Sequence, residues 1–385
     1  MKKIIIFLAV FLFANPLFII NEYRSAVGLN SLEDNPSLDF AAKLHAKYMF
    51  KNNEFSHYEK KYGYRFAGVT PADRAMSCGY PSRFVIENIS KGEKSYKESV
   101  KDLFSAIYHR LAFLNFNINE IGYYRLNDIY VYDMGNKYIS EACDNLEKFN
   151  SGFAGLCRDK NKIIPKEVYI ANMQNNPKVV FWPYNGMKNT PPVFYDEIPD
   201  PLPDYGVCGY PVSISFNPYY YKNKKIQLIT FTLYKGKMPV NDVKIITSET
   251  DENHMLKKTD FVLFPLQRLE YGAKYNVEAD FVIDGKIKSY KWSFEVEDKY
   301  IPVINVIGNK GKYYIKPNIT YLIYFKPLNK NDKLSDLKYE FRRGLTINKI
   351  GYKDANTLYL NISGKNNKKL KIYTKNRRIT LIIKD

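Results

Sequence analysis

The sequence predicts an α+β protein in which a mixed N-terminal domain precedes all-β modules. Residues 20–150 contain segments whose apolar side chains recur at helical spacing. From residue 212 onward apolar and polar residues alternate instead, which is typical of strands. Between these regions, residues 176–211 contain eight prolines, which predicts an extended connector and not the interior of a sheet.

The mixed domain is expected to contain two helices followed by a strand pair. Residues 38–51 place apolar side chains at steps of three and four, and Ser37 is the expected N-cap. Residues 95–114 repeat this spacing in a second helix. Residues 121–124 and 129–132 then alternate as two strands joined by a short turn.

The rest of the chain is expected to form two β-rich units. Alternating segments between residues 212 and 296 predict a β-sandwich of the immunoglobulin-like kind. A last unit continues the same pattern. The expected divisions are an export signal at 1–14, the mixed domain at 20–150, a disulfide loop and proline-rich connector at 151–211, a sandwich at 212–298 and a basic β-rich module at 299–385.

Length and composition exclude several protein classes. The chain has 385 residues, of which 45% are hydrophobic and 16% aromatic, so it is too apolar to be disordered. Outside the first twenty residues no apolar run approaches the ~20 residues of a membrane-spanning helix, which excludes a multi-span membrane protein. No repeat of about 20–50 residues indicates a solenoid.

The first residues resemble an export signal. Lys2 and Lys3 precede an apolar stretch from Ile4 to Ala14, and cleavage after Ala14 is expected. The alternative is an uncleaved anchor. We therefore expect an exported protein that is periplasmic, attached to the cell surface or secreted.

Export favours disulfide formation among the four cysteines, which allow three pairings. None has the Cys-x-x-Cys spacing of a zinc or redox site. We favour Cys143 with Cys157, which closes a short loop, and therefore Cys78 with Cys208.

An ordered series of short motifs occupies residues 21–135. The motifs are Asn21-Glu22-Tyr23-Arg24, Gly28-Leu29, Ala41-Ala42, His45-Ala46, Phe55-Ser56-His57-Tyr58-Glu59, Thr70-Pro71, Asp73-Arg74, Gly79-Tyr80, Glu87-Asn88-Ile89, His109-Arg110 and Glu120-Ile121-Gly122. In this order they resemble the bacterial branch of the CAP superfamily, whose members carry SCP-like extracellular domains. The resemblance implies an α-β-α sandwich with a surface cleft that holds His and acidic residues and, in some members, a divalent metal.

The resemblance identifies three candidate cleft residues, which are His57, Glu87 and His109. Imidazole and carboxylate groups together suit zinc binding or general acid–base chemistry, so zinc is the candidate cofactor and these three are its candidate ligands. The family's second acidic residue is missing here unless Asp102 or Glu98 replaces it.

Several of these residues also have a structural explanation. His45 lies on an apolar stripe and is expected to be a core histidine. His109 could instead stabilise the C-terminal end of its helix, and Glu87 could order its own loop. Asp73 and Arg74 are expected to form a structural ion pair.

Two function classes follow from the resemblance. The first is an extracellular or envelope binding module with a His/Glu cleft. The second is a metal-assisted, peptidase-like hydrolase that uses the same cleft. We place binding ahead of catalysis because no Ser or Cys nucleophile stands in a recognised context and one acidic residue is missing.

Positive charge is concentrated near the C-terminus. Residues 301–385 contain 19 Lys and Arg against 5 Asp and Glu, which is +14 of the chain's net +18. Residues 370–373 and 379–383 alternate, so these charges are expected to project from strands. Because export separates the protein from nucleic acid, we expect an anionic envelope partner, either polysaccharide or lipid. The alternative is that the charge only maintains solubility.

Overall fold

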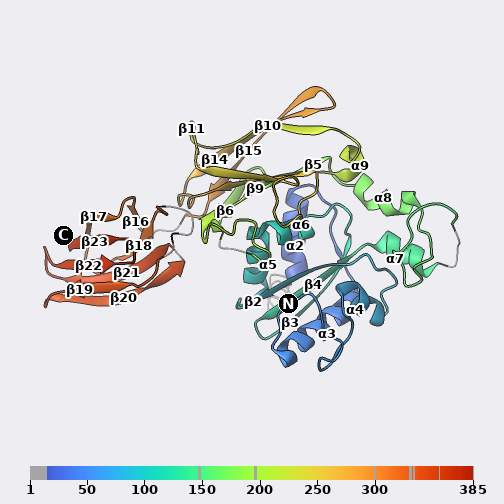
Figure 1. Ribbon diagram of the computed structural model, residues 1–385, viewed down its shortest axis with the longest axis horizontal. Coiled ribbons are helices and arrows are strands. Elements are labelled where there is room, and N and C mark those ends of the chain that lie inside the picture. Colours follow the sequence, from blue (N-terminus) through green and yellow to red (C-terminus); the bar gives the residue numbers. More distant parts are fainter. Residues whose placement is uncertain are drawn as a thin grey trace, which may run out of the picture.

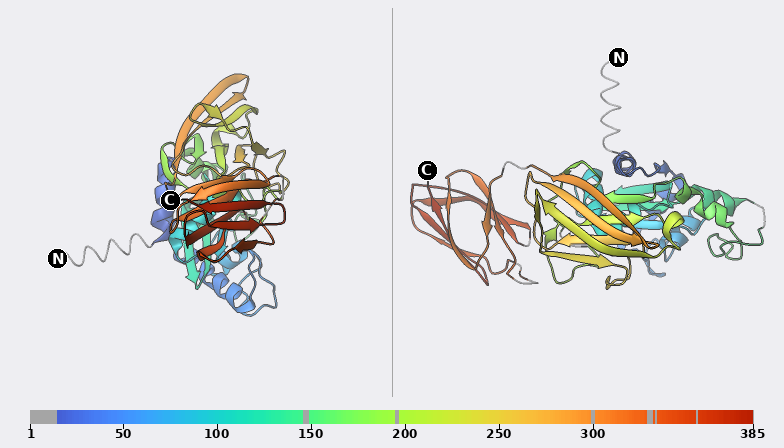
Figure 2. Two further views of the ribbon diagram at one scale, coloured as in Figure 1. Left: turned by 90° about the vertical axis from the view of Figure 1, so that its left-hand side faces the viewer. Right: turned by 90° about the horizontal axis from the view of Figure 1, so that it is seen from above.

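The chain forms an elongated molecule with three parts (Figures 1 and 2). The computed structural model describes residues 15–145, 149–194, 197–298, 301–328, 332, 334–354 and 356–384. The expected export signal at 1–14 lies outside the described residues. Within the described ranges no helix is both long and apolar enough to cross a membrane.

The N-terminal part is a sheet between two layers of helices, so the predicted α-β-α sandwich and the α+β fold class are confirmed. Its four strands lie in the order β1 (Glu33–Asp34), β3 (Glu120–Leu126), β4 (Ile129–Gly135) and β2 (Ile86–Lys91). One face is covered by α3 (Pro36–Asn52) and α4 (Pro71–Ser77), and the other by α2 (Pro16–Ala26), α5 (Tyr96–Ser105) and α6 (Ile107–Phe113). The strands predicted at 121–124 and 129–132 are the β3–β4 hairpin.

Helix α3 begins at Pro36, because Asn35 and not Ser37 is its N-cap. The Asn35 side-chain oxygen accepts hydrogen bonds from the backbone nitrogens of Ser37 (3.0 Å) and Leu38 (3.3 Å). Pro36 occupies the first helical position, where a missing N–H costs nothing. The prediction of Ser37 as the cap was therefore wrong by two residues.

The helix predicted at 95–114 is two helices that meet at Ala106. The backbone of Ala106 is extended, with ψ of 127°. The new N-terminus of α6 is capped by the carboxylate of Glu197, which accepts from the backbone nitrogens of Ile107 (2.6 Å) and Tyr108 (3.0 Å). A helix cap 90 residues away in the sequence is invisible to local periodicity.

Gly122 allows α3 to lie directly on β3. A Cβ atom at this position would stand 2.0 Å from the backbone nitrogen of Asp39 and 2.1 Å from the carbonyl carbon of Leu38. The Asp39 carboxylate also accepts a hydrogen bond from Tyr123 N at 2.7 Å. The glycine in the Glu120-Ile121-Gly122 motif is therefore required for helix–sheet packing.

The middle part is the predicted β-sandwich. One sheet has the order β11 (Met238–Pro239), β10 (Ile226–Lys235), β14 (Lys274–Ile283), β15 (Lys286–Val296) and β6 (Met187–Thr190). The other has β12 (Val243–Thr247), β13 (Asp260–Pro265), β9 (Val212–Phe216) and β5 (Val179–Trp182). Strands β5 and β6 lie in the stretch predicted as a connector, so the sandwich starts before residue 212. Both are edge strands, where flanking prolines remove no ladder hydrogen bond.

The N-terminal domain and this sandwich share one hydrophobic core. Trp182 packs on Phe104 with ring centroids 4.9 Å apart and donates from Nε1 to the Tyr210 hydroxyl at 2.8 Å. Tyr210 in turn donates to the backbone oxygen of Phe104 at 2.9 Å. The fully buried Arg110 donates to Pro211 O at 2.9 Å. The two domains therefore form a single packed unit.

Three short helices and a strand pair complete this unit. They are α7 (Lys137–Asp144), α8 (Lys166–Gln174), α9 (Pro218–Tyr221), β7 (Val193–Phe194) and β8 (Cys208–Gly209).

The C-terminal part is a second two-sheet sandwich with its own core. Its sheets are β16 (Val303–Val306), β18 (Thr320–Phe325), β21 (Thr357–Gly364) and β20 (Leu345–Asp354), and β17 (Lys310–Ile315), β23 (Arg378–Ile383), β22 (Lys369–Tyr373) and β19 (Lys338–Phe341). Arg268 of the middle sandwich reaches across to it and donates to Asp354 Oδ2 (3.1 Å) and Thr357 Oγ1 (2.9 Å).

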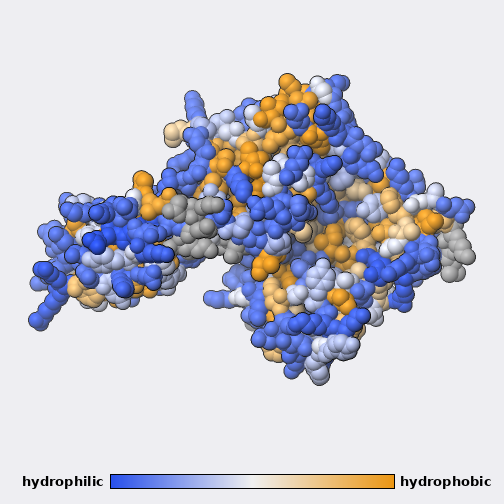
Figure 3. All heavy atoms as spheres, in the orientation of Figure 1, coloured by the Kyte–Doolittle hydropathy of each residue, from blue (hydrophilic) through white to orange (hydrophobic). Residues whose placement is uncertain are grey.

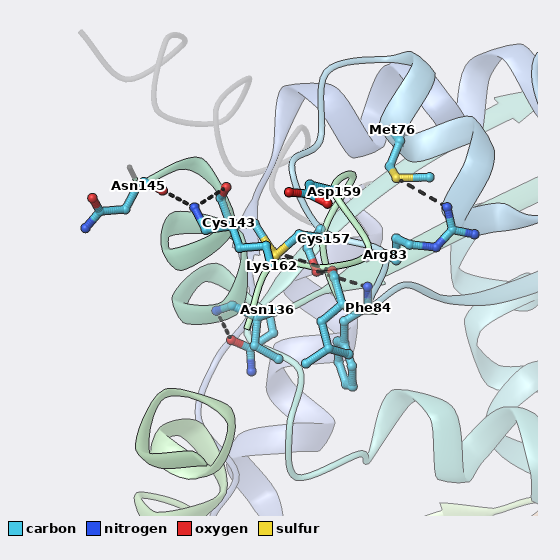
Figure 4. The surroundings of a disulfide bond; sticks show 12 residues. Met76, Arg83, Phe84, Asn136, Cys143, Asn145, Cys157, Asp159 and Lys162 are labelled. Carbon is cyan, nitrogen blue, oxygen red and sulfur yellow. Dashed lines mark hydrogen bonds between the residues drawn. A yellow bond between two sulfur atoms is a disulfide. The ribbon is translucent and has the colours of Figure 1, made fainter. Parts of the chain in front are cut away.

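One of the two expected disulfides is present. Cys143 and Cys157 are bonded, with Cα atoms 5.3 Å apart (Figure 4). The pairing of Cys78 with Cys208 was wrong, because both are free thiols in different hydrophobic clusters. Cys78 follows α4, whereas Cys208 is fully buried on β8, where burial raises its pKa well above the usual range. Bridging would need their Cα atoms within about 7 Å.

Candidate functional site

Six ionisable side chains gather on the face of the sheet that α3 and α4 cover. They are His45 of α3, His57 and Glu59 of the following loop, Arg74 of α4, Glu87 of β2 and Asp133 of β4. We call this group the His57 cluster. Five members are buried, whereas 36% of the His57 side chain is exposed. The cluster therefore meets solvent through one imidazole.

Glu87 is the centre of the cluster. Its Oε1 accepts from His57 Nδ1 at 2.8 Å and its Oε2 accepts from Arg74 Nη2 at 2.6 Å. Burial opposes ionisation of Glu87, but His45, Arg74 and His57 outweigh it and lower the pKa to about 2. The ionised carboxylate can only accept, so His57 donates from Nδ1 and presents Nε2 outward.

His45 fastens the loop that carries His57. Its Nδ1 lies 2.9 Å from Glu59 Oε1 and its Nε2 lies 2.9 Å from the backbone oxygen of Ser56. Glu59 Oε2 also accepts from Ala67 N at 2.8 Å. His45 is fully buried, as expected for a core histidine, and it helps to hold His57 in place.

Asp133 stands directly opposite Glu87 in the β2–β4 ladder. Both of its carboxyl oxygens are buried, and neither has a hydrogen-bond donor among the described residues. Burial and the neighbouring Glu87 charge raise the Asp133 pKa well above its usual range. Asp133 therefore holds a proton more strongly than an ordinary aspartate does, and Glu87 is the neighbouring carboxylate that could share this proton.

Arg74 turns into the cluster and does not pair with Asp73. Asp73 instead accepts from Arg83 Nη2 at 3.1 Å and from Thr70 as part of a capping box. Neighbouring residues on a helix face different directions, so consecutive Asp and Arg are poor partners. The expected ion pair was therefore wrong.

His109 lies on the other face of the sheet. Its Nδ1 is 3.0 Å from Glu197 Oε2, and its backbone oxygen accepts from Asn88 Nδ2 at 2.9 Å. Asn88 follows Glu87 on β2, and consecutive strand residues point to opposite faces. The structure therefore brings His57 and Glu87 together and places His109 apart from them.

The His57 cluster does not suit zinc. Both oxygens of Glu87 are engaged by His57 and Arg74, and the guanidinium puts a fixed positive charge beside the carboxylate. Within the described ranges no three His, Cys, Asp or Glu side chains are grouped to hold a metal ion. Glu98, a suggested replacement for the missing acid, accepts from Lys94 N at the start of α5.

Other motif residues are structural. The fully buried Arg24 donates to the backbone oxygens of Phe113 (2.7 Å) and Ile118 (3.2 Å) and so joins α2 to the end of α6. The Tyr80 hydroxyl donates to Glu120 Oε2 at 2.9 Å. Arg24 and Tyr80 therefore belong to the motif series because they hold the domain together, and they are not members of the His57 cluster.

Sequence reasoning placed His57 and Glu87 in the site but did not assign Arg74, Glu59 or Asp133 to it. Arg74 and Glu59 stood inside the motif series, so their presence was a usable signal. Asp133 carried none, because its pairing with Glu87 depends on strand register.

Sequence comparisons with known proteins match the N-terminal part of the chain. Residues 17–132 match the sequence model of the cysteine-rich secretory protein family, the CAP family. The curated "Uncharacterized protein YkwD" of Bacillus subtilis (strain 168) is 32% identical over 102 residues, which are 26% of this chain and 37% of that protein. The chain thus matches little more than a third of that relative's length.

Two solved structures are also similar to about a third of this chain. One is an extracellular protein containing a SCP domain from Bacillus anthracis str. Ames, with 23% identity, 32% of this chain and 39% of that chain covered, and a TM-score of 0.29. The other is an outer surface protein from Borrelia burgdorferi, with 26% identity, 30% and 86% covered, and a TM-score of 0.27.

Proposed function

Residues 17–132 form a CAP/SCP-like domain of the bacterial type, and from this premise we propose that the chain is an exported binding protein of the cell envelope. Two observations support export. Lys2 and Lys3 precede an apolar stretch, as in an export signal, and Cys143 and Cys157 form a disulfide. Two surfaces would act together, namely the exposed imidazole of the His57 cluster and a basic sheet on the C-terminal module.

The orientation of His57 carries the proposal. Glu87 holds Nδ1, and Arg74 Nη1 donates to the His57 backbone oxygen at 3.1 Å. The ring is therefore fixed, with Nε2 directed away from the buried carboxylate. A fixed imidazole edge recognises a hydrogen-bonding ligand at little cost in side-chain entropy.

The same arrangement favours binding over covalent catalysis. A Glu–His pair resembles the base and orienter of a hydrolase, which keeps hydrolysis as the second candidate function. However, among the described residues no hydroxyl or thiol is hydrogen-bonded to His57. The Arg74 charge also disfavours the metal that a metal-assisted hydrolase would use.

A histidine substitution separates the two functions. Purified full-length protein and its His57→Gln variant would be assayed for binding to isolated cell-wall polysaccharide and for turnover of a peptide and cell-wall substrate panel, with and without zinc. His254→Gln, at an exposed histidine of the middle sandwich, is the matched control. We expect His57→Gln alone to weaken binding, with no turnover by any form. Turnover that His57→Gln abolishes would replace binding with hydrolysis.

The C-terminal module presents a basic face on the sheet β17-β23-β22-β19. Register places Lys310, Arg378 and Tyr373 side by side in one row and Lys312, Thr380 and Lys371 in the next. We call the exposed cations of this sheet the basic face, which consists of Lys310, Lys312, Lys338, Lys369, Lys371 and Arg378. The Arg378 guanidinium also lies 5.3 Å from the Tyr373 ring centroid. An ordered array of this kind suits an anionic polysaccharide.

Charge reversal tests this second surface. The triple substitution Lys369→Glu, Lys371→Glu and Arg378→Glu should abolish binding of the full-length chain to an acidic polysaccharide at low salt. Each basic group near an anionic surface contributes about 1 kcal/mol, and salt screens it. An equal reversal at Lys237, Lys286 and Lys288, exposed residues of the middle sandwich, should leave binding unchanged. Binding that ignores both salt and the basic-face reversal would leave solubility as the role of these charges.

A further inference from the structure

A large pocket opens where the N-terminal domain, the disulfide loop with α8, and the middle sandwich meet. Its volume is about 820 Å³, which is near the upper end for small-molecule sites. Apolar side chains from all three parts line it, among them Ile86, Leu111, Phe116, Phe153, Ile170 and Met255. Figure 3 shows apolar surface in the hollow between these parts. We call this site the junction pocket.

Three lysines give the junction pocket a positive rim. Lys166 begins α8, Lys222 follows α9, and Lys257 precedes β13. All three are exposed, and none forms a salt bridge with a carboxylate in the part of the chain that the structure describes. Their convergence from separate elements around an apolar hollow complements a ligand with an anionic end.

Two polar residues of the wall, Asn117 and Asp260, make hydrogen bonds within the protein. Asn117 is 4% exposed, and its Oδ1 accepts from Asn136 Nδ2 at 3.1 Å. The acidic residue in the lining, Asp260, accepts from the backbone nitrogen of Lys257 at 3.1 Å, and burial raises its pKa. The charge of Lys257, one of the three rim lysines, acts against this rise and favours the ionised form of Asp260.

The disulfide fixes one wall of the pocket in advance. Cys157 forms a β-bridge with Ser82, and Arg83 N donates to the backbone oxygen of Leu156 at 2.7 Å (Figure 4). Leu156 is itself part of the lining. The loop that the bond to Cys143 closes is therefore held against the N-terminal domain, so the pocket exists before any ligand arrives.

We propose that the junction pocket binds a single-chain amphiphile, with the acyl chain among the apolar side chains and the carboxylate at the lysine rim. The volume and apolar lining provide for the chain, and the three rim lysines provide for the charge. No member of the His57 cluster lines this pocket. The inference therefore stands apart from the proposed function, and failure of one would not affect the other.

The test uses full-length protein with its disulfide intact and cis-parinaric acid as a fluorescent carboxylate probe. Competition with saturated fatty acids should weaken about fourfold for each methylene removed from the chain, which is the value of a buried methylene. Hexadecanol should compete about tenfold more weakly than hexadecanoate, because three exposed cations each add a small favourable term.

Two sets of variants locate the site. Lys166→Gln, Lys222→Gln and Lys257→Gln combined should weaken hexadecanoate to the level of hexadecanol. The matched control, in which Lys237, Lys286 and Lys288 of the middle sandwich are all replaced by Gln, should leave the binding of hexadecanoate unchanged. Ala112→Trp, which fills the pocket from α6, should abolish binding of both compounds.

Four outcomes would overturn the proposal, and the first three concern the fatty-acid assays. They are equal competition by hexadecanol and hexadecanoate, equal weakening by the two lysine triples, and absence of saturable probe binding. The lysine triple lies on the surface and should fold normally, so it decides the question even if Ala112→Trp does not fold. Preference for an apolar peptide over every fatty acid would assign the pocket to a protein segment and also refute the proposal.

Discussion

Glu87→Gln should destabilise the unit formed by the N-terminal domain and the middle sandwich, whereas Asp133→Asn should not. The Glu87 side chain is 1% exposed and contacts Arg74 Nη2 at 2.6 Å. Glutamine keeps the shape but leaves the Arg74 charge buried without its main partner. Removing one member of a buried ion pair costs about 3–5 kcal/mol. Glu59 Oε1 lies 3.9 Å from Arg74 Nε and still attracts the guanidinium in the variant. We therefore expect Glu87→Gln to lower the free energy of unfolding by about 3 kcal/mol, at the low end of this range.

The lowered pKa of Glu87 expresses the same stabilisation as a dependence on pH. The surroundings lower it from 4.5 to about 2. A carboxyl group with a lowered pKa in the folded state adds stability above its unfolded pKa, and this stability is lost as the pH falls from about 4.5 toward 2. A pKa difference of about 2.5 corresponds to about 3 kcal/mol. The difference in the free energy of unfolding between wild type and Glu87→Gln should therefore become smaller as the pH falls below 4.5.

Asp133 acts in the opposite direction. Because burial and Glu87 raise its pKa, the folded protein keeps a proton that the unfolded chain releases above a pH near 3.8. Folding therefore becomes less favourable as the pH rises through this range. Asparagine can donate its amide hydrogen to Glu87 without holding that proton. We expect Asp133→Asn to leave stability at pH 7 unchanged or to increase it.

Tryptophan fluorescence during urea unfolding measures these changes in the relevant unit. The two tryptophans of the chain, Trp182 and Trp292, both belong to the core that the N-terminal domain and middle sandwich share. Residues 301–385 contain none, so their unfolding does not contribute to the signal. If Asp133→Asn cost as much as Glu87→Gln at pH 7, Asp133 would be a charged partner and the shared-proton argument would fail.

Three further predictions use simple assays. Gly122→Ala should cost about 2–3 kcal/mol in the same urea experiment, because its Cβ would stand 2.0 Å from Asp39 N. Thiol titration of the denatured, unreduced protein should find two groups, Cys78 and Cys208, and a count of zero would contradict the observed pairing. Limited proteolysis of the folded protein should spare residues 176–211, because this proline-rich stretch supplies β5 and β6 and both strands are paired in sheets. Rapid cleavage within these two strands would contradict that packing.

The sequence by itself determined the features that depend on neighbouring residues. Helical spacing located α3, and alternation located the β3–β4 hairpin, whose turn at Asn127 has a φ of 57°. The short separation of Cys143 and Cys157 made their pairing predictable. The motif series indicated the domain type and the pair formed by His57 and Glu87, because the order of motifs can be read from the sequence without knowledge of tertiary contacts.

Only the tertiary structure decided what the pair is connected to. Asp133 joins Glu87 because the register of β2 and β4 sets these two residues opposite each other. His109 lies on the other face, where its helix packs and where strand alternation directs Asn88, which donates to the His109 backbone oxygen; the cap of that helix comes from Glu197. These contacts join residues far apart in the chain, and their energies depend on burial and register, which local propensity does not encode. Packing against the middle sandwich likewise creates the junction pocket, because its walls come from three separate parts of the chain.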